Sequence, residues 1–472
     1  MSKIAFGTDG WRAVMADQFT FANVRLVTQA IAKYLVEEKV EGKGIVIGYD
    51  NRFLSENFAQ EVAEVLTGNG IKVLITQKPT PTPVVAYAVK ENKCSGAVML
   101  TASHNPAEYN GIKFIPHYAG PALPHITKKI EEKLEQVMQN EEVKALTIEK
   151  ALNEGLVSYI DPKESYFNHL KSLVDLKALA ETKLKIVVDP MHGVGSGYLD
   201  TFLSDAGCQV AVIRGERDAF FGGSLPEPTG RNLQLLRDSM ERTGARLGLA
   251  NDGDADRFGV IDVNGDYLSP NQILVLLTSH LLKKGQRGAI VRTVATTHML
   301  DKMAEKYGLE LIETPVGFKY IGGAMLEKNV LIGGEESGGL SVMGHIPEKD
   351  GVLADCLIAE LVAYEGKSLV EVLEDLRKEF GSFYSERIDL HCTQEEKVEI
   401  LEKMPNLEID QLNGVPVVKK ITVDGLKVVL QDGSWFLMRP SGTESLFRLY
   451  AEGESKEAVK RLQDAVKNLM GL

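Results

Sequence analysis

Residues 96–106 read Gly-Ala-Val-Met-Leu-Thr-Ala-Ser-His-Asn-Pro, and they indicate both a fold class and a place for chemistry. The first five are small and apolar, which is typical of a buried strand in a parallel sheet. Pro106 disfavours helical geometry at Asn105, so a turn should follow the strand. Ligand clefts in open α/β sheets form at the carboxyl ends of strands. We therefore expect Ser103 on a stiff turn that faces a cleft.

Short apolar segments of the same kind recur along the chain, and amphipathic or charged helical patterns separate many of them. They lie at residues 44–50, 72–76, 185–189, 208–213, 246–250, 289–292 and 330–333. Strands that alternate with helices predict parallel α/β sheets. A charged helical stretch at 126–152 is expected to close the first unit. From about residue 382, alternating strands and a final amphipathic helix from Lys456 predict a smaller α+β domain.

The chain has 472 residues, which is too long for one hydrophobic core, and a formal net charge of −13. This charge disfavours nucleic acid or an anionic membrane surface as the main partner, but it does not exclude an anionic small substrate. Cys94, Cys208, Cys356 and Cys392 show neither disulfide nor metal spacing, which indicates a reducing cytoplasm. We find no signal-peptide pattern and no apolar run near the roughly 20 residues of a membrane span.

The sequence Asp252-Gly253-Asp254-Ala255-Asp256-Arg257 carries three carboxylates at alternate positions. Carboxylate oxygens suit Mg²⁺ or Mn²⁺, and three close negative charges repel one another unless a cation lies among them. An EF-hand does not fit, because Arg257 stands where that loop needs glycine and Val263 where it needs glutamate. A solvated acidic turn is the alternative. We expect a metal site here.

Two further loops offer groups for a phosphorylated, hydroxylated ligand. Residues 439–444, Arg-Pro-Ser-Gly-Thr-Glu, combine a guanidinium, two hydroxyls and a glycine, which suit a phosphate group. An ordinary turn is the alternative there. Residues 333–339, Gly-Gly-Glu-Glu-Ser-Gly-Gly, place carboxylates and a hydroxyl after a buried strand, where they could bind sugar hydroxyls. A helix start with acidic residues near its N-terminus is the alternative for this loop.

Three lysines are candidates for the same cleft. Lys113 follows Asn110-Gly111, and a turn at those two residues would bring it back toward Ser103. Lys319 and Lys349 lie in predicted loops and would, on their own, be assigned to the surface.

Two other functions have little support. Ser103 lacks the Gly-x-Ser-x-Gly elbow of α/β hydrolases. The glycine-rich residues 193–197 lack both the dinucleotide-binding spacing and the lysine of a phosphate-binding P-loop.

In this order, the motifs at 101–106, 252–257, 334–339 and 439–444 resemble those of the α-D-phosphohexomutase superfamily. Residues 7–12 and 110–113 are also similar to that family, so the resemblance covers essentially the whole chain. It implies an α/β fold with three related α/β domains of mixed, mostly parallel sheets, plus a C-terminal α+β domain, around a central cleft. The expected domains are residues 1–155 with the phosphoserine loop, 156–262 with the metal loop, 263–378 with the sugar-binding loop and 379–472 with the phosphate-binding loop.

The resemblance also implies a mechanism. Ser103 would be carried as a phosphoserine, give its phosphoryl group to the sugar, and receive the other phosphate of the bisphosphorylated intermediate. Mg²⁺ would be bound by Asp252, Asp254, Asp256 and a phosphoserine oxygen of Ser103. Around the reacting group the resemblance places Arg12, His104, Lys113 and Arg257, with Lys113 or His104 moving the proton. For substrate binding it implies Glu335, Ser337, Lys319, Lys349, Arg439, Ser441, Gly442 and Thr443.

The sugar is inferred from residues 335–339, Glu-Glu-Ser-Gly-Gly. Glu-Glu-Ser resembles the phosphoglucomutase pattern, whereas the two glycines depart from the Phe-Gly of many of those enzymes and leave mannose phosphate open. We expect interconversion of glucose 1-phosphate and glucose 6-phosphate, with glucose 1,6-bisphosphate as intermediate and activator. The alternatives are a phosphomannomutase or dual-specificity enzyme, and then a phosphoglucosamine mutase or hexose-bisphosphate synthase. A cytoplasmic monomer or homodimer that binds a phosphorylated hexose is expected.

Overall fold

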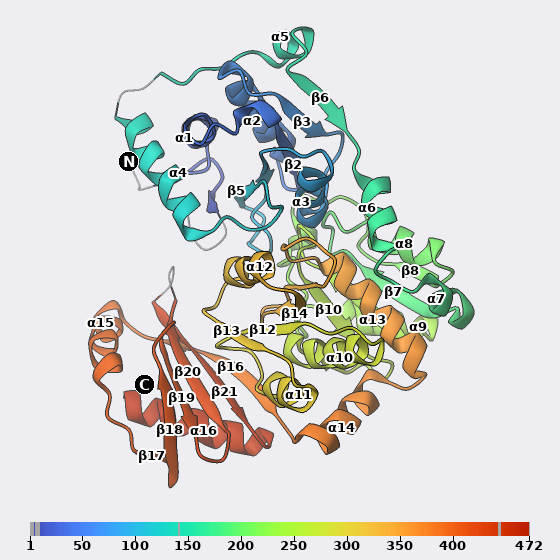
Figure 1. Cartoon of the computed structure of the whole chain (residues 1–472), viewed down its shortest axis with the longest axis vertical. Helices are drawn as coiled ribbons and strands as arrows, with labels where there is room; N and C mark the ends of the chain where they lie inside the picture. Colours follow the sequence, from blue (N-terminus) through green and yellow to red (C-terminus); the bar gives the residue numbers. More distant parts are fainter. Residues whose placement is uncertain (1–3, 5–9, 140–141, 442–444, 472) are drawn as a thin grey trace.

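The computed structural model describes residue 4 and residues 10–139, 142–441 and 445–471. Within these residues the chain forms four sheets that follow one another along the sequence, each with its own helices (Figure 1). The first three sheets mix parallel and antiparallel pairs, and the fourth is antiparallel. The expected class, three α/β units and a C-terminal α+β unit, is confirmed.

In the first unit, helices cover both faces of a sheet with the order β1-β5-β4-β2-β3-β6. Its elements are β1 (Trp11–Val14), α1 (Phe21–Glu37), η1 (Glu41–Lys43), β2 (Ile45–Tyr49), α2 (Ser55–Gly68), β3 (Val73–Thr76), α3 (Thr82–Glu91), β4 (Gly96–Leu100), β5 (Tyr109–Pro116), α4 (Pro124–Met138), α5 (Ile148–Asn153) and β6 (Val157–Ile160). Ile45 and Ile47 of β2 pack with α1 and α2, while Val46 between them packs with α3. Because both faces are buried, the strand is apolar throughout. β6 pairs with β3 and lies beyond residue 155.

The second and third units share one hydrophobic core. After α6 (Lys163–Leu170) and α7 (Leu176–Thr182), the second unit contains β7 (Lys185–Asp189), α8 (Leu199–Asp205), β8 (Gln209–Val212), η2 (Phe221–Gly223), α9 (Gln234–Thr243), β9 (Leu247–Asn251), β10 (Phe258–Ile261) and β11 (Tyr267–Leu268), with the sheet order β11-β10-β9-β7-β8. The third contains α10 (Pro270–Lys283), β12 (Ala289–Thr293), α11 (Met299–Tyr307), β13 (Leu311–Thr314), α12 (Phe318–Glu327), β14 (Val330–Gly334), β15 (Leu340–Val342), α13 (Gly351–Glu365) and α14 (Leu369–Phe380), with the order β13-β12-β14-β15. Val352 and Leu353 of α13 lie in the same cluster as Leu249 of β9 and Val260 of β10. This packing fixes the loop that follows β9 relative to the third unit.

The fourth unit is an antiparallel sheet with the order β16-β21-β20-β19-β18-β17. Its elements are β16 (Tyr384–His391), α15 (Gln394–Lys403), η3 (Met404–Asn406), β17 (Gln411–Leu412), β18 (Val415–Ile421), β19 (Leu426–Leu430), β20 (Trp435–Pro440), β21 (Leu446–Gly453) and α16 (Lys456–Met470). Trp435 packs with Val294 of the third unit. Beside it, the fully buried Lys427 donates from Nζ to Glu313 Oε2 of the third unit (3.1 Å). An ion pair between a buried lysine and a half-buried glutamate therefore crosses this boundary.

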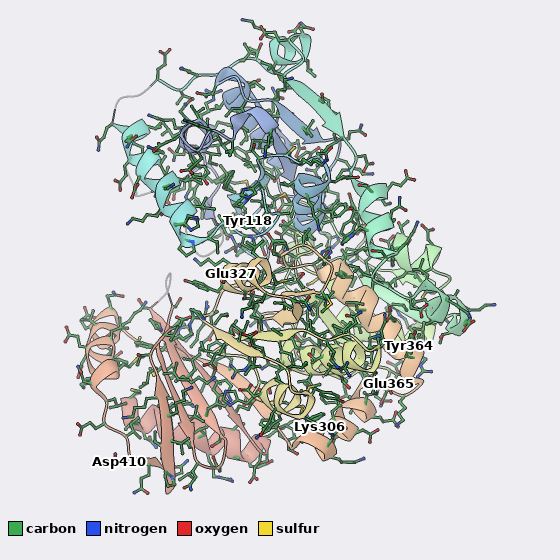
Figure 2. All side chains as sticks on the ribbon, in the orientation of Figure 1. Tyr118, Lys306, Glu327, Tyr364, Glu365 and Asp410 are labelled. Carbon is green, nitrogen blue, oxygen red and sulfur yellow. The ribbon has the colours of Figure 1, made fainter. Side chains whose placement is uncertain are left out.

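Charged side chains such as Lys306, Glu327 and Asp410, which Figure 2 labels, are exposed. In the described part of the chain, no helix has both the length and the apolar composition needed to cross a membrane.

The prediction of a turn at Asn110-Gly111 is wrong. Both residues lie inside β5, and the chain reverses earlier, between β4 and β5. Asn110 Nδ2 donates to Ser55 Oγ (2.9 Å), which ties β5 to the start of α2. At Gly111 an added Cβ would lie 2.5 Å from the carbonyl oxygen of Thr101. These residues, which favour turns, here serve close packing inside a strand.

The charged stretch 126–152 does not form one helix, because α4 and α5 are separate. Between them the backbone N–H of Leu146 donates to the carbonyl of Glu64 in α2 (2.8 Å). A tertiary contact therefore overrides the helical propensity of the sequence in this segment.

Gly48→Ala should destabilise the first unit. A Cβ at this position in β2 would lie 2.3 Å from Val85 Cγ2 and 3.1 Å from Met99 Sδ. Overpacking of this kind costs about 1–3 kcal/mol, and the stiff valine cannot easily move away. The measurement is the midpoint of the first unfolding transition in urea. Gly42→Ala is the matched control, because no atom lies within 4 Å of its added Cβ. Equal midpoints for the two variants would contradict the prediction.

Candidate active site

The first three sheets present a loop at the same place. In each, a strand that pairs in parallel with a central strand is followed by an antiparallel partner: β4 by β5, β9 by β10 and β14 by β15. The loops between these strands hold Ser103, the aspartates at 252–256, and residues 335–339. Each loop thus leaves the carboxyl end of its parallel strand, where α/β sheets bind ligands.

The three aspartates of the second loop converge. Ligand oxygens of Asp252, Asp254 and Asp256 all lie within 4.8 Å of one another. The side chains are at most 1% exposed. Ala255 between them has a φ of +57°, a left-handed conformation that lets alternate side chains turn to one side.

Cations from two other units reach this cluster. Lys113 Nζ of β5 donates to Asp254 Oδ2 (2.9 Å) and Asp256 Oδ2 (3.0 Å). Lys349 Nζ of the third unit lies 3.3 Å from Asp256 Oδ2. The structure therefore brings the first and third units together on the acidic loop of the second.

These contacts divide the aspartates electrostatically. Burial, with the charges of Asp254 and Asp256, raises the pKa of Asp252 well above its ordinary value. Burial acts in the same direction on Asp254, but Lys113 and a hydrogen bond from Thr82 outweigh it and lower the pKa of Asp254. Lys113 and Lys349 likewise lower the pKa of Asp256 against its burial. Of the three carboxyl groups, Asp252 is the one whose negative charge is least compensated by neighbouring cations.

The donor set fits a divalent cation. Asp254 Oδ1 and Asp256 Oδ1 are buried and have no hydrogen-bond partner, although a buried carboxylate oxygen without a partner is costly. Ser103 Oγ donates to Asp252 Oδ2 (2.8 Å), which puts a fourth oxygen beside the three carboxylates. An all-oxygen set of this kind suits Mg²⁺ or Mn²⁺.

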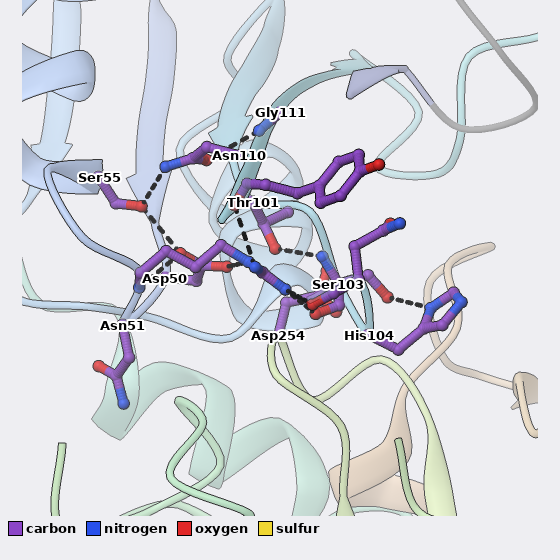
Figure 3. A network of polar contacts seen from close by, with 12 residues as sticks. Asp50, Asn51, Ser55, Thr101, Ser103, His104, Asn110, Gly111 and Asp254 are labelled. Atoms are coloured by element: carbon purple, nitrogen blue, oxygen red, sulfur yellow. Dashed lines mark hydrogen bonds and ion pairs between the residues drawn. The ribbon is translucent and has the colours of Figure 1, made fainter. Parts of the chain in front are cut away.

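Ser103 is held in an uncommon backbone conformation on its loop. Its φ is +51°, and its backbone N–H donates to Thr101 Oγ1 (2.8 Å; Figure 3). Its carbonyl packs on the metal loop so closely that a Cβ on Gly253 would lie 2.6 Å from the Ser103 oxygen. The stiff turn predicted from the sequence is present, and a second unit of the chain closes over it.

His104 and Arg12 flank this serine. His104 Nδ1 lies 3.3 Å from Ser103 Oγ, as the dashed line in Figure 3 marks. The charge of Arg257, burial and the charge of Arg12 hold the pKa of His104 well below its ordinary value, so the imidazole is neutral. Arg12 Nη1 donates to Asn105 Oδ1 of the same loop (2.9 Å). Arg257 lies 3.8 Å from Asp256 Oδ1 through its Nε.

The third loop lies next to Lys349. Burial raises the pKa of Glu335, and the charge of Lys349 opposes this shift. A Cβ on Gly339 would lie 2.4 Å from Lys349 Cδ, so glycine is needed here. Ser337 is exposed. Glu336 Oε2 accepts a hydrogen bond from Thr293 Oγ1, at the end of β12 (2.8 Å).

The remaining predicted residues that the structure describes belong to α12 and to the fourth unit. Lys319 is half-buried in the first turn of α12, with its Nζ 5.5 Å from the ring centre of Tyr320. Arg439 of β20 pairs through Nη2 with Asp424 Oδ2 (2.9 Å). Ser441 is buried, and its carbonyl accepts from Lys397 Nζ (2.7 Å). Gly442 and Thr443, which we also predicted to bind phosphate, lie outside the described residues.

Sequence reasoning missed two residues in this region. Thr82 of α3 donates from Oγ1 to Asp254 Oδ2 (2.7 Å), across the boundary between the first and second units. Arg52 donates to the Ser103 carbonyl (2.7 Å) and is fully buried. A charged residue just after the buried strand β2 was the available signal for Arg52, because strand ends of this sheet meet at the site.

Comparisons with known proteins agree with this geometry. Four family models match in order: phosphoglucomutase/phosphomannomutase alpha/beta/alpha domain I at residues 3–141, domain II at 164–265, domain III at 269–380 and the C-terminal domain at 395–469.

Relatives match over the whole chain. A "Phosphoglucomutase/phosphomannomutase" of Thermococcus kodakarensis is 31% identical, over 98% of this chain and 99% of the relative. A "Probable phosphoglucosamine mutase" of Methanobrevibacter smithii is 34% identical, over 97% and 96%. A solved structure from Thermus thermophilus, titled "putative phosphomannomutase", is 35% identical with a TM-score of 0.86, and 100% of each chain is covered. The chain therefore belongs to the phosphoglucomutase/phosphomannomutase family of the α-D-phosphohexomutase superfamily, whose members are isomerases that act as intramolecular phosphotransferases.

Proposed function

We propose that this enzyme interconverts glucose 1-phosphate and glucose 6-phosphate, with Ser103 as the phosphoryl carrier and glucose 1,6-bisphosphate as the intermediate. The observation that carries the proposal is the hydrogen bond of Ser103 Oγ to Asp252, at the edge of three buried carboxylates. A hydroxyl beside a site for a hard cation favours phosphoryl over acyl transfer.

The chemistry is a pair of matched transfers. A sugar hydroxyl attacks the phosphorus of phosphorylated Ser103; the new bond joins phosphorus to the sugar oxygen, and the bond to Ser103 Oγ breaks. The proton leaves the sugar hydroxyl, and Ser103 Oγ regains a proton when it is released. Lys113 or the neutral His104 would move these protons. His104 Nδ1 lies 3.3 Å from Ser103 Oγ, and Lys113 Nζ donates to Asp254 Oδ2 (2.9 Å). After the bisphosphate turns over, its other phosphate returns to Ser103 by the reverse steps.

Mg²⁺ would be held by Asp252, Asp254, Asp256 and an oxygen on Ser103. When bound, Mg²⁺ would neutralise part of the negative charge on the phosphoryl group that is transferred. Arg12, Arg257 and Lys113 add fixed positive charge around the same group.

Substrate recognition divides between two loops. Glu335 and Ser337 would accept and donate hydrogen bonds at ring hydroxyls, while Lys349 and Lys319 bind nearby oxygens. Arg439, Ser441, Gly442 and Thr443 would bind the phosphate that does not react. Because the intermediate must bind in both orientations, one distant phosphate site can serve each of them.

The choice of glucose rests on Glu335-Glu336-Ser337. The relatives carry the names of glucose, mannose and glucosamine phosphate mutases, so a phosphomannomutase or dual-specificity enzyme is the second candidate. The pair Gly338-Gly339 departs from the Phe-Gly of many phosphoglucomutases and so leaves that second candidate open.

Ser103→Ala should abolish turnover, because no hydroxyl remains to carry the phosphoryl group. The assay is conversion of glucose 1-phosphate by protein primed with glucose 1,6-bisphosphate and Mg²⁺. Ser239→Ala, at a buried serine in α9, should keep activity and serves as the control. Full activity in Ser103→Ala would refute the phosphoserine mechanism.

Asp254→Asn should weaken Mg²⁺ binding by at least about 100-fold, since even outer partners of a metal site can be worth that much. The measurement is the Mg²⁺ concentration that gives half-maximal activity, together with direct titration calorimetry. Asp238→Asn, at an exposed position in α9, should not change either value. An unchanged Mg²⁺ titration for Asp254→Asn would exclude the ligand role.

Glucose 1-phosphate should give the highest kcat/KM when it is compared side by side with mannose 1-phosphate and glucosamine 1-phosphate. The expected reason is the match of Glu335 and Ser337 to the ring hydroxyls of glucose. A higher value for mannose 1-phosphate would replace glucose with the second candidate, while leaving the phosphoserine mechanism in place.

A further inference from the structure

Both terminal nitrogens of the Arg52 guanidinium donate to the serine loop. Nη2 donates to the carbonyl oxygens of Ser103 (2.7 Å) and Asn105 (2.7 Å). Nη1 donates to those of Pro106 (2.7 Å) and Tyr109 (3.0 Å). The four terminal N–H groups thus bind four carbonyls of one turn. A planar fork with fixed donor directions can do this, whereas the three tetrahedral donors of a lysine cannot.

The guanidinium is itself held by Asp50 and by Phe221. Its Nε lies 3.2 Å from Asp50 Oδ2, and both side chains are fully buried. Asp50 Oδ1 accepts from Ser55 Oγ (2.9 Å) and from the backbone N–H of Arg52 (3.0 Å), which fixes the carboxylate at the end of β2 (Figure 3). The ring of Phe221, from the second unit, lies 4.9 Å from the centre of the guanidinium. Arg52 therefore cannot change position without disturbing the core of the first unit.

The turn needs this support. Ser103 has a φ of +51°, in the left-handed region that residues with a Cβ rarely adopt. Such a conformation persists where the surroundings fix it, and it occurs often at functional sites. On one side the Thr101 hydroxyl accepts from the Ser103 N–H, and on the other Arg52 binds the Ser103 carbonyl. Together they fix both peptide groups of this residue, and so the direction of its Cα–Cβ bond.

We propose that Arg52 is a positioning residue for phosphoryl transfer: it holds the turn 103–109 in the conformation that directs Ser103 Oγ at the metal-binding aspartates. The assignment rests on the proposed role of Ser103. The four terminal donors of Arg52 are all used by the loop, so the guanidinium has none left for a substrate. The lysine and methionine variants keep a long side chain but lose the fork.

The test compares full-length Arg52→Lys and Arg52→Met with the unchanged enzyme in Mg²⁺. A small misplacement of a reacting group costs about 100-fold in rate, so kcat should fall by about that factor in Arg52→Met and by less in Arg52→Lys. The KM for glucose 1-phosphate should stay within about twofold, because the distant phosphate site is untouched. Hydrogen exchange of the amides between 103 and 109 should become at least about tenfold faster in both variants.

Arg214→Lys is the matched control. Arg214 is a largely buried arginine of the second unit whose Nε donates to Asp189 Oδ1 (2.9 Å), at the end of β7, just as Arg52 pairs with the aspartate that ends β2. Arg214→Lys should lower the unfolding temperature without changing kcat or the rate of hydrogen exchange in the serine turn. Should Arg52→Met fail to fold, Arg52→Lys alone carries the test.

Two outcomes would overturn the proposal: unchanged kcat and exchange in Arg52→Lys and Arg52→Met, or an equal loss of kcat in Arg214→Lys. Failure of the proposed function is seen separately, by intact-mass measurement of the unchanged enzyme after incubation with glucose 1,6-bisphosphate. If that enzyme gains no phosphoryl group, the carrier role of Ser103 fails, while the exchange data still show whether Arg52 holds the turn.

Discussion

The concentration of negative charge on one buried loop is the constraint on which the arrangement of the first three units depends. Three carboxylates whose oxygens lie within 4.8 Å of one another cannot be buried without compensation. Among the residues that the structure describes, the second unit brings Arg257, whose Nε lies 3.8 Å from Asp256 Oδ1, and closer cations come from the neighbouring units: Lys113 from the first and Lys349 from the third. The interfaces between the units and the chemistry of the site therefore use the same contacts. A substitution that weakens one should weaken the other.

The three α/β units use the same strand arrangement to present three loops of different chemistry. Each places its functional loop between a parallel strand and an antiparallel partner, so the loops leave equivalent ends of their sheets. One loop carries a hydroxyl, one carries carboxylates, and one carries groups suited to sugar hydroxyls. No repeat is visible in the sequence, because apolar residues exchange freely inside buried strands while the loops have different chemistry. The similarity is therefore one of topology.

Features that depend on a local sequence pattern could be predicted, whereas features that depend on contacts between distant residues were missed. Buried strands and the acidic turn could be identified, because a run of apolar residues indicates burial and aspartates carry charge. Asn110-Gly111 was interpreted as a turn, since these residues usually form one; Gly111 is glycine instead because the Thr101 carbonyl lies where a side chain would be. Arg52 gave almost no signal, because its importance comes from four carbonyls that only the folded turn assembles. Residues whose role is to bind backbone groups of a distant segment are the hardest to identify from a sequence.

The two ends of the proposed substrate site are held differently, and the proposed mechanism needs that difference. Ser103 is buried and its turn is held by Arg52, so the reacting phosphoryl group has one position. Arg439 is half-buried and paired with Asp424, whose Oδ2 also accepts from the backbone N–H of Val316 in the third unit (3.0 Å). A phosphate dianion competes well with a single carboxylate for an arginine, because it offers more charge and more acceptor oxygens. An arginine that can exchange one anion for another suits an intermediate that must be released, turned and bound again, whereas the phosphoryl carrier must not move between the two transfers.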